Sequence, residues 1–152
     1  MKFIFDALDQ FRANSWKAVE GLSEEQLNKI PDGYGNNLAW NLGHMVASQQ
    51  GLCYRLSATP LLVPDSFIAQ YKKDSSPKGW TKPADLKEIK QYFEVTSAAF
   101  QKDYESGKLN NYTEYKTSSG ATLKTIEDAL IYNYGHENLH YGVILSLKKL
   151  VK

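Results

Sequence analysis

The three histidines of the chain are its strongest candidates for a metal-binding or reactive site. His136 and His140 are four residues apart, one turn of an α-helix, so both imidazoles can project from one face and reach one metal ion. His44 lies in another long apolar segment, and crossing helices in a bundle commonly bring a lone ligand to a ligand pair. A site of three nitrogen ligands with no fourth protein ligand would keep one position open for water or substrate, which is typical of catalytic metal sites.

A plainer interpretation of these histidines stays open. They could be core imidazoles that are hydrogen-bonded to a neighbouring tyrosine or asparagine. Burying three unpaired imidazoles would carry a desolvation cost with no visible offset, and small residues such as Ala47, Ser48 and Gly51 leave room around His44. The sequence therefore favours a metal site made of His44, His136 and His140.

Four other side chains could contribute to the site: Asn41, Tyr132, Asn133 and Glu137. Asn41 and Asn133 could orient an imidazole or a ligand, although hydrogen bonds between helices explain them equally well. Tyr132 could place a phenol in the pocket, and Glu137 could support a ligand. Glu137 lies about 100° around the helix from His136, so we expect a surface or inter-helix residue there. The letters His-Glu-x-x-His also match the zincin protease motif, but no histidine follows His140, which weakens that assignment. Cys53 points away from His44 on its helix, and we expect a small core residue. No catalytic or cofactor-binding residue beyond these candidates is identified.

Size and composition bound the class of protein. A chain of 152 residues with 42% hydrophobic and 23% charged residues fits one globular domain covering residues 1–152. The net charge of +1 leaves no cationic excess for a nucleic-acid partner. The apolar stretches are far shorter than the roughly 20 residues of a membrane span, no targeting segment is visible, and a single cysteine fits a reducing compartment. We expect a cytoplasmic protein without a membrane or nucleic-acid partner.

Hydrophobic periodicity predicts four long helices: Phe3 to about Glu20, Asn36 or Asn37 to about Ser57, Pro83 to Ser106, and about Lys124 to Val151. Ser23 to Gln26 has the form of a capping box that starts a short helical turn. The long connection from Pro60 to Lys82 includes a predicted short helix over Asp65 to Lys72 and suits a crossover in a bundle. The polar stretch Asn110 to Thr122 could form a short extended arm.

Two of these helices carry stripes that we expect to face the core. In the second helix the stripe is Leu38, Leu42, Met45, Leu52 and Leu56. In the last helix it is Ala129, Tyr132, His136, His140, Val143, Leu147 and Leu150. The predicted fold class is therefore all-α, with the histidines inside.

Two segments resemble motifs of the DinB-like superfamily. NLAWNLGHMVASQQGL is similar to the family's second-helix motif, in which a tryptophan precedes a metal-ligating histidine, and YNYGHENLHYGVIL is similar to the last-helix motif H-E-x-x-H-x-G-Q. The resemblance covers the whole chain in helix order and length. It implies a four-helix bundle of DinB-like topology with a long crossover connection, with His44, His136 and His140 as the metal triad and Gly142 at the family's glycine. Tyr141 and Val143 replace a basic residue and a glutamine common in the family, so substrate specificity is not carried over.

The resemblance also implies a range of functions. Some members resemble metal-dependent thiol S-transferases that use bacillithiol or mycothiol, one group isomerises maleylpyruvate, and many have no assigned activity. We expect a divalent metal (Zn, Ni or Fe) that activates a thiol or water, a small-molecule substrate and a low-molecular-weight thiol. Two alternatives stay open: a non-catalytic metal- or ligand-binding bundle related to stress, and a structural dimerisation module. The helix with Phe11 and Trp16 could form the interface of a homodimer.

Overall fold

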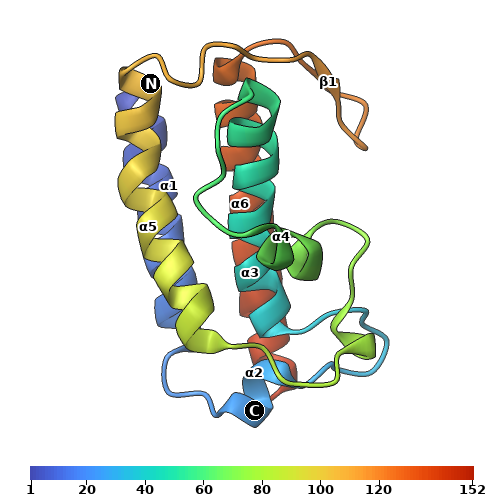
Figure 1. Cartoon of the computed structure of the whole chain (residues 1–152). Helices are drawn as coiled ribbons and strands as arrows, with labels where there is room; N and C mark the ends of the chain where they lie inside the picture. Colours follow the sequence, from blue (N-terminus) through green and yellow to red (C-terminus); the bar gives the residue numbers. More distant parts are fainter.

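Four long helices form a bundle in the computed structural model, which describes all residues, 1–152 (Figure 1). These helices are α1 (Lys2–Val19), α3 (Leu38–Gln49), α5 (Leu86–Glu105) and α6 (Ile126–Leu150). Following the chain colours in Figure 1, α1 and α6 run in one direction and α3 and α5 in the other. Because α3 and α5 are parallel, the chain between them must return along the bundle. The predicted all-α fold with a long crossover connection is confirmed.

Short elements fill the connections. α2 (Glu24–Asn28) has the predicted capping box, in which Ser23 and Gln26 bond each other's backbone amides. The crossover includes α4 (Asp65–Tyr71), as predicted, and the short 3-10 helix η3 (Pro77–Gly79). Beyond α5, β1 (Tyr115–Lys116) pairs antiparallel with β2 (Thr122–Leu123). The expected extended arm is thus one strand of a small hairpin.

Two helices begin later than the sequence predicts. α5 begins at Leu86 and not at Pro83, because the Asp85 carboxylate accepts hydrogen bonds from the backbone amides of Lys87 and Glu88 and caps the first turn. α6 begins at Ile126 and not at Lys124, because Thr125 is the N-cap of a capping box with Asp128. Side-chain caps therefore set both starts.

The second predicted helix reaches Ser57 but does not stay α-helical. α3 passes into a π-helical turn, η1 (Gln50–Tyr54), and then a 3-10 turn, η2 (Arg55–Ser57). The wider π turn changes the direction of the side chains within and after it compared with a regular α-helix. Cys53, inside the turn, is fully buried, as predicted for a core residue. Leu52 and Leu56, expected in the core stripe, are only half-buried.

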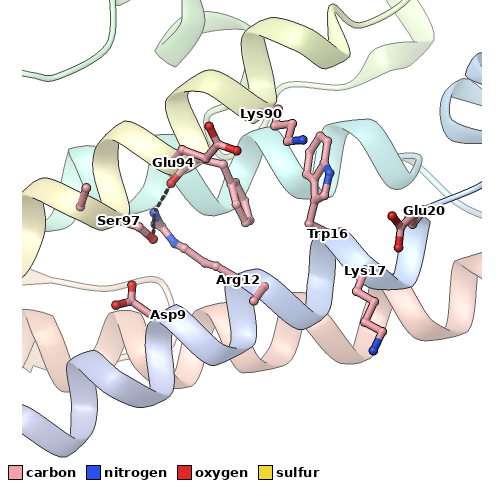
Figure 2. Close-up of a pocket in the computed structure, with 11 residues that line it drawn as sticks. Asp9, Arg12, Trp16, Lys17, Glu20, Lys90, Glu94 and Ser97 are labelled. Atoms are coloured by element: carbon pink, nitrogen blue, oxygen red, sulfur yellow. Dashed lines mark hydrogen bonds between the residues drawn. The ribbon is translucent and has the colours of Figure 1, made fainter.

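A groove of about 630 Å³ lies between α1 and α5 (Figure 2). Trp16 lines this groove, with the Lys90 ammonium 5.8 Å from its ring centre. The Phe11 ring, by contrast, packs within the chain against Tyr134 and Tyr141. Of the two aromatic residues considered for a subunit interface, only Trp16 lines the groove. None of the helices combines the length and hydropathy that a bilayer crossing requires.

Candidate metal centre

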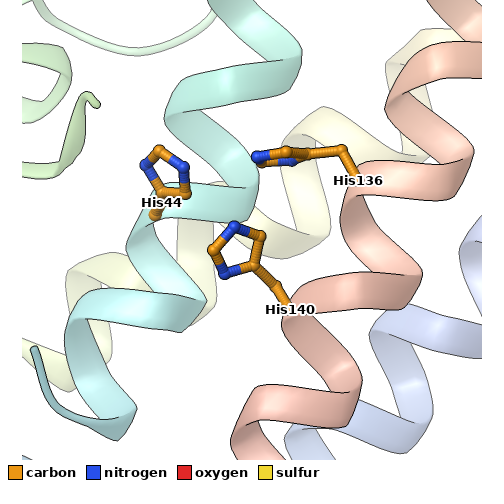
Figure 3. A group of neighbouring side chains, drawn as sticks. All are labelled: His44, His136 and His140. Carbon is orange, nitrogen blue, oxygen red and sulfur yellow. The ribbon is translucent and has the colours of Figure 1, made fainter. Parts of the chain in front are cut away.

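The bundle brings the three histidines together from α3 and α6 (Figure 3). Their ring centres are 4.5 to 5.1 Å apart, and one ring nitrogen from each lies within 4.8 Å of the other two. Two nitrogens bound to one ion at about 2.1 Å are at most about 4.2 Å apart, so a small closing movement of the rings would suffice. His44, His136 and His140 could therefore hold one metal ion.

His44 is held in place by the crossover connection. Its Nδ1 lies 2.6 Å from the backbone carbonyl oxygen of Tyr71, and the Trp40 ring stacks on its face with centres 4.4 Å apart. A carbonyl oxygen only accepts, so Nδ1 carries the proton and the Nε2 lone pair stays available. That lone pair meets only the Ser48 hydroxyl, at 3.2 Å.

Gly43 allows the Tyr71 ring to pack directly against the backbone of α3. A Cβ atom at position 43 would clash with the Tyr71 ring, and Tyr71 supplies the carbonyl that orients His44. The glycine just before His44 in the sequence is therefore a structural requirement of the site, which the sequence analysis did not recognise.

Asn41 orients His140, which matches one of the roles considered from the sequence. The amide nitrogen of Asn41 donates to the Asn37 carbonyl oxygen and to Asn36 Oδ1, which turns its own oxygen toward His140. The Nδ1 of His140 donates to this oxygen at 2.8 Å, so Nε2 is again the free nitrogen. His44 and His140 thus have the same tautomer for the same physical reason.

His136 is the histidine without a protein partner on its Nδ1, which is buried and unpaired. An unpaired buried nitrogen carries a desolvation cost that native structures usually avoid. A satisfied core histidine would bond a tyrosine or an asparagine at this atom. The structure provides neither, which fits a ligand that comes from outside the chain.

The electrostatic surroundings keep all three rings neutral, the form that binds metals. Burial lowers the pKa of His44 to about 4, partly opposed by the bond to the Tyr71 carbonyl. Burial also lowers the pKa of His136 to about 4. Burial and then the other two histidines lower the pKa of His140 to about 3. Near pH 7 these rings offer lone pairs and not positive charges.

The other candidate residues of α6 divide between two places. Tyr132 lines the pocket beside the histidines, and its hydroxyl lies 3.2 Å from the Ser119 hydroxyl. Asn133 bonds Glu137, which forms an ion pair with Arg12 at 2.7 Å. Neither Asn133 nor Glu137 forms a hydrogen bond with a histidine, so the structure does not bring these two residues to the candidate site.

The burial of α6 also corrects two expectations. Glu137 is fully buried, so the surface part of its expected role is wrong and the inter-helix part is right. The most buried face of α6 includes Asn133, Glu137 and Ile144, because the helix packs against α1 as well as α3. In the stripe predicted for this helix, Ala129 and Leu147 are buried as expected, Tyr132, His136, His140 and Val143 are half-buried, and Leu150 is exposed, contrary to expectation. The partial exposure gives the His136 ring access to a pocket.

A pocket of about 330 Å³ opens onto His44 and His136. Its apolar wall comes from α3, η1, η2 and α4, and it includes Leu52, Leu56 and Ile68. The segment from β1 to α6 adds hydroxyl groups from Thr117, Ser118 and Tyr132, among others. Apart from Tyr132, no sequence pattern predicted this wall, because the hairpin and the crossover are far from the histidines along the chain.

Comparison with known proteins agrees with this geometry. A family model described as the DinB superfamily matches residues 7–144, a range that includes all three histidines. The comparison with curated proteins returned no match.

Proposed function

The chain belongs to the DinB superfamily, and we propose that it is a metal-dependent enzyme of the thiol S-transferase or hydrolase type. In this proposal His44, His136 and His140 hold one divalent ion of zinc, nickel or iron. Imidazole ligands suit all three metals. The observation that carries the proposal is the convergence of three neutral imidazoles, one with an unpaired buried nitrogen, beside an open pocket.

The chemistry of the ligand set supports a reactive site. A divalent ion supplies Lewis acidity, which lowers the pKa of a thiol or water that binds to it. The protein contributes three nitrogens and no fourth side chain within the cluster, which matches the open arrangement of catalytic sites. Asn41 and the Tyr71 carbonyl orient two of the ligands, and such outer hydrogen bonds tune metal sites.

The nucleophile in this proposal comes from outside the chain. Cys53 is the only cysteine, it is fully buried, and burial raises the pKa of its thiol, which makes it unreactive. A thiol-transfer reaction would therefore need a low-molecular-weight thiol in the pocket, and a hydrolysis would need a water molecule there. The small electrophilic substrate would occupy the remaining space.

The experiment is a turnover assay with zinc-, nickel- or iron-loaded protein. Bacillithiol, mycothiol, glutathione and cysteine serve as thiols with monobromobimane as electrophile, and 4-nitrophenyl acetate tests hydrolysis. We expect metal-dependent turnover with one of these nucleophiles, lost in His136→Gln. Bound metal with no turnover across the panel would favour the alternative of a non-catalytic metal- or ligand-binding bundle.

A further inference from the structure

The charged side chains that line the histidine pocket are all of one sign. Its lining includes Arg55, Lys72 and Lys73 and no aspartate or glutamate. The chain as a whole has 18 basic and 17 acidic residues, so the composition alone would give a mixed lining. Three cations without an acid at a pocket mouth raise the local concentration of anions.

The two lysines of this set are free to bind a ligand. Neither the Lys72 nor the Lys73 ammonium takes part in an ion pair or a side-chain hydrogen bond in the structure, and both side chains are exposed. Arg55 bonds Asp65 at 2.9 Å, with the two side chains 54% and 88% exposed. Exposed pairs of this kind contribute little, so an anionic ligand can replace Asp65 at small cost.

The groove between α1 and α5 provides the internal comparison. It also has three cations, Arg12, Lys17 and Lys90, but its lining adds Asp9, Glu20 and Glu94 (Figure 2). Arg12 is moreover held by Glu137 and by the Thr96 hydroxyl. The lining of the larger groove is therefore neutral overall, in contrast to the lining of the pocket beside the histidines.

The rest of the pocket limits the size and shape of a ligand. A volume of about 330 Å³ is at the small end of the range for small-molecule sites. Leu52, Leu56 and Ile68 offer an apolar wall, and the Tyr132 hydroxyl adds a polar group. A ligand that satisfies all of these features has a compact apolar body and one anionic end.

We propose that the pocket binds a small organic acid, with its carboxylate or phosphate at Arg55, Lys72 and Lys73 and its apolar body toward the histidines. The ligand's role as substrate or thiol rests on the proposed function. Its binding as an anion rests on the pocket alone. The test therefore uses metal-free protein, so that an anion bound directly to an ion cannot produce the signal.

The test is isothermal titration calorimetry with phenylacetate, phenyl phosphate and the neutral analogue phenylacetamide, on protein treated with EDTA. We expect phenylacetate or phenyl phosphate to bind at least about tenfold more tightly than phenylacetamide, which corresponds to about 1.4 kcal/mol. The variant Lys72→Gln/Lys73→Gln should weaken anion binding about tenfold and leave phenylacetamide unchanged. The matched control Lys148→Gln/Lys149→Gln makes the same charge change outside the pocket lining and should have no effect.

Three results would overturn the anion site. They are equal affinity for phenylacetate, phenyl phosphate and phenylacetamide, an unchanged anion affinity in Lys72→Gln/Lys73→Gln, or no anion binding with a dissociation constant below about 1 mM. Whichever anion binds better identifies the preferred head group. Because no metal is present, the result is independent of the turnover assay. If the protein binds the anions more tightly than phenylacetamide but shows no turnover, the anion site is supported and the proposed enzyme activity is contradicted.

Discussion

Two buried polar clusters meet at neighbouring residues of α6, and they differ in how their polar atoms are satisfied. On one side, Glu137 accepts two hydrogen bonds from Arg12, at 2.7 and 2.9 Å, and a third from Asn133. Arg12 also donates to the Thr96 hydroxyl at 2.8 Å. On the other side, His136 has a buried nitrogen with no partner, and all three imidazoles face one another without a carboxylate.

The comparison shows which cluster is electrostatically complete within the chain, although the Oδ1 of Asn133 is also buried without a partner. The Arg12–Glu137 cluster balances its charges and joins α1, α5 and α6, so its role is to hold the bundle together. The histidine cluster has converging lone pairs, and the Ser48 hydroxyl, 3.2 Å from the Nε2 of His44, is the side chain outside the cluster that meets one of them. A group from outside the chain would complete it, and a metal ion is the group that suits three imidazoles.

The largest effect should come from breaking the complete cluster. Glu137→Ala leaves the Arg12 guanidinium buried without its counter-charge, and we expect the free energy of unfolding to fall by about 3–5 kcal/mol. Urea denaturation of metal-free protein measures this. Arg12→Met/Glu137→Leu removes both charges and should regain most of the loss. If Glu137→Ala lowers the free energy of unfolding by less than about 1 kcal/mol, the account is contradicted, because solvent-exposed ion pairs contribute no more than that.

Completing the histidine cluster should have the next largest effect. Zinc at 100 to 1,000 times its dissociation constant stabilises a protein that binds it only when folded by about 2.7–4.1 kcal/mol. For a chain of this size we expect the melting temperature to rise by about 5–15 °C. Differential scanning fluorimetry with and without zinc measures the shift. His136→Gln should remove the zinc-induced rise in melting temperature, and without metal it should melt near the metal-free wild type. A full zinc-induced rise in this variant would argue against the histidine triad as the metal site.

Two buried asparagines, one in each cluster, test whether only the histidine cluster affects zinc affinity. Asn41→Leu removes the acceptor that orients His140, so zinc affinity should fall about 10–100-fold. Asn133→Leu is the matched change on the other side, where the amide bonds only Glu137, and it should lower stability without changing zinc affinity. Competition with a zinc-binding dye gives both affinities. Equal losses of affinity in the two variants would remove the distinction.

Protonation of the three histidines should produce the smallest effect on stability. The three imidazoles have a pKa of about 3 to 4 in the folded protein, below the ordinary value of 6.5. The unfolded chain therefore binds more protons between these values, and stability is lost as the pH falls through this window. Between pH 7 and pH 6.5 we expect metal-free protein to lose about 0.7 kcal/mol, measured by urea denaturation. His136→Gln/His140→Gln should show a weaker dependence, and an identical slope would show that other groups are responsible.

Much of the fold was predictable from local patterns. Apolar periodicity located the four helices and α4, and the Ser23 capping box located α2. The helix spacing of His136 and His140, with His44 in another apolar helix, predicted which side chains would meet. These features depend on residues that are close in sequence or on the regular geometry of a helix.

What the sequence could not provide depends on packing between distant segments. No residue pattern in Gln50–Tyr54 predicts a π turn, yet Leu52 in this turn and Leu56 after it are only half-buried. The partners Arg12 and Glu137 are 125 positions apart, so the burial of Glu137 had no local signal. The walls of the pocket likewise come from the crossover and the hairpin, whose positions depend on the assembled bundle.

The most direct test of the central claim is the metal content of the purified protein. The protein is incubated with zinc or nickel, desalted and measured by inductively coupled plasma mass spectrometry. We expect close to one ion per chain in the wild type and in Lys148→Gln/Lys149→Gln, and almost none in His44→Ala or His136→Gln. Wild-type protein that stays metal-free after this treatment, with an unchanged melting temperature, would contradict the account.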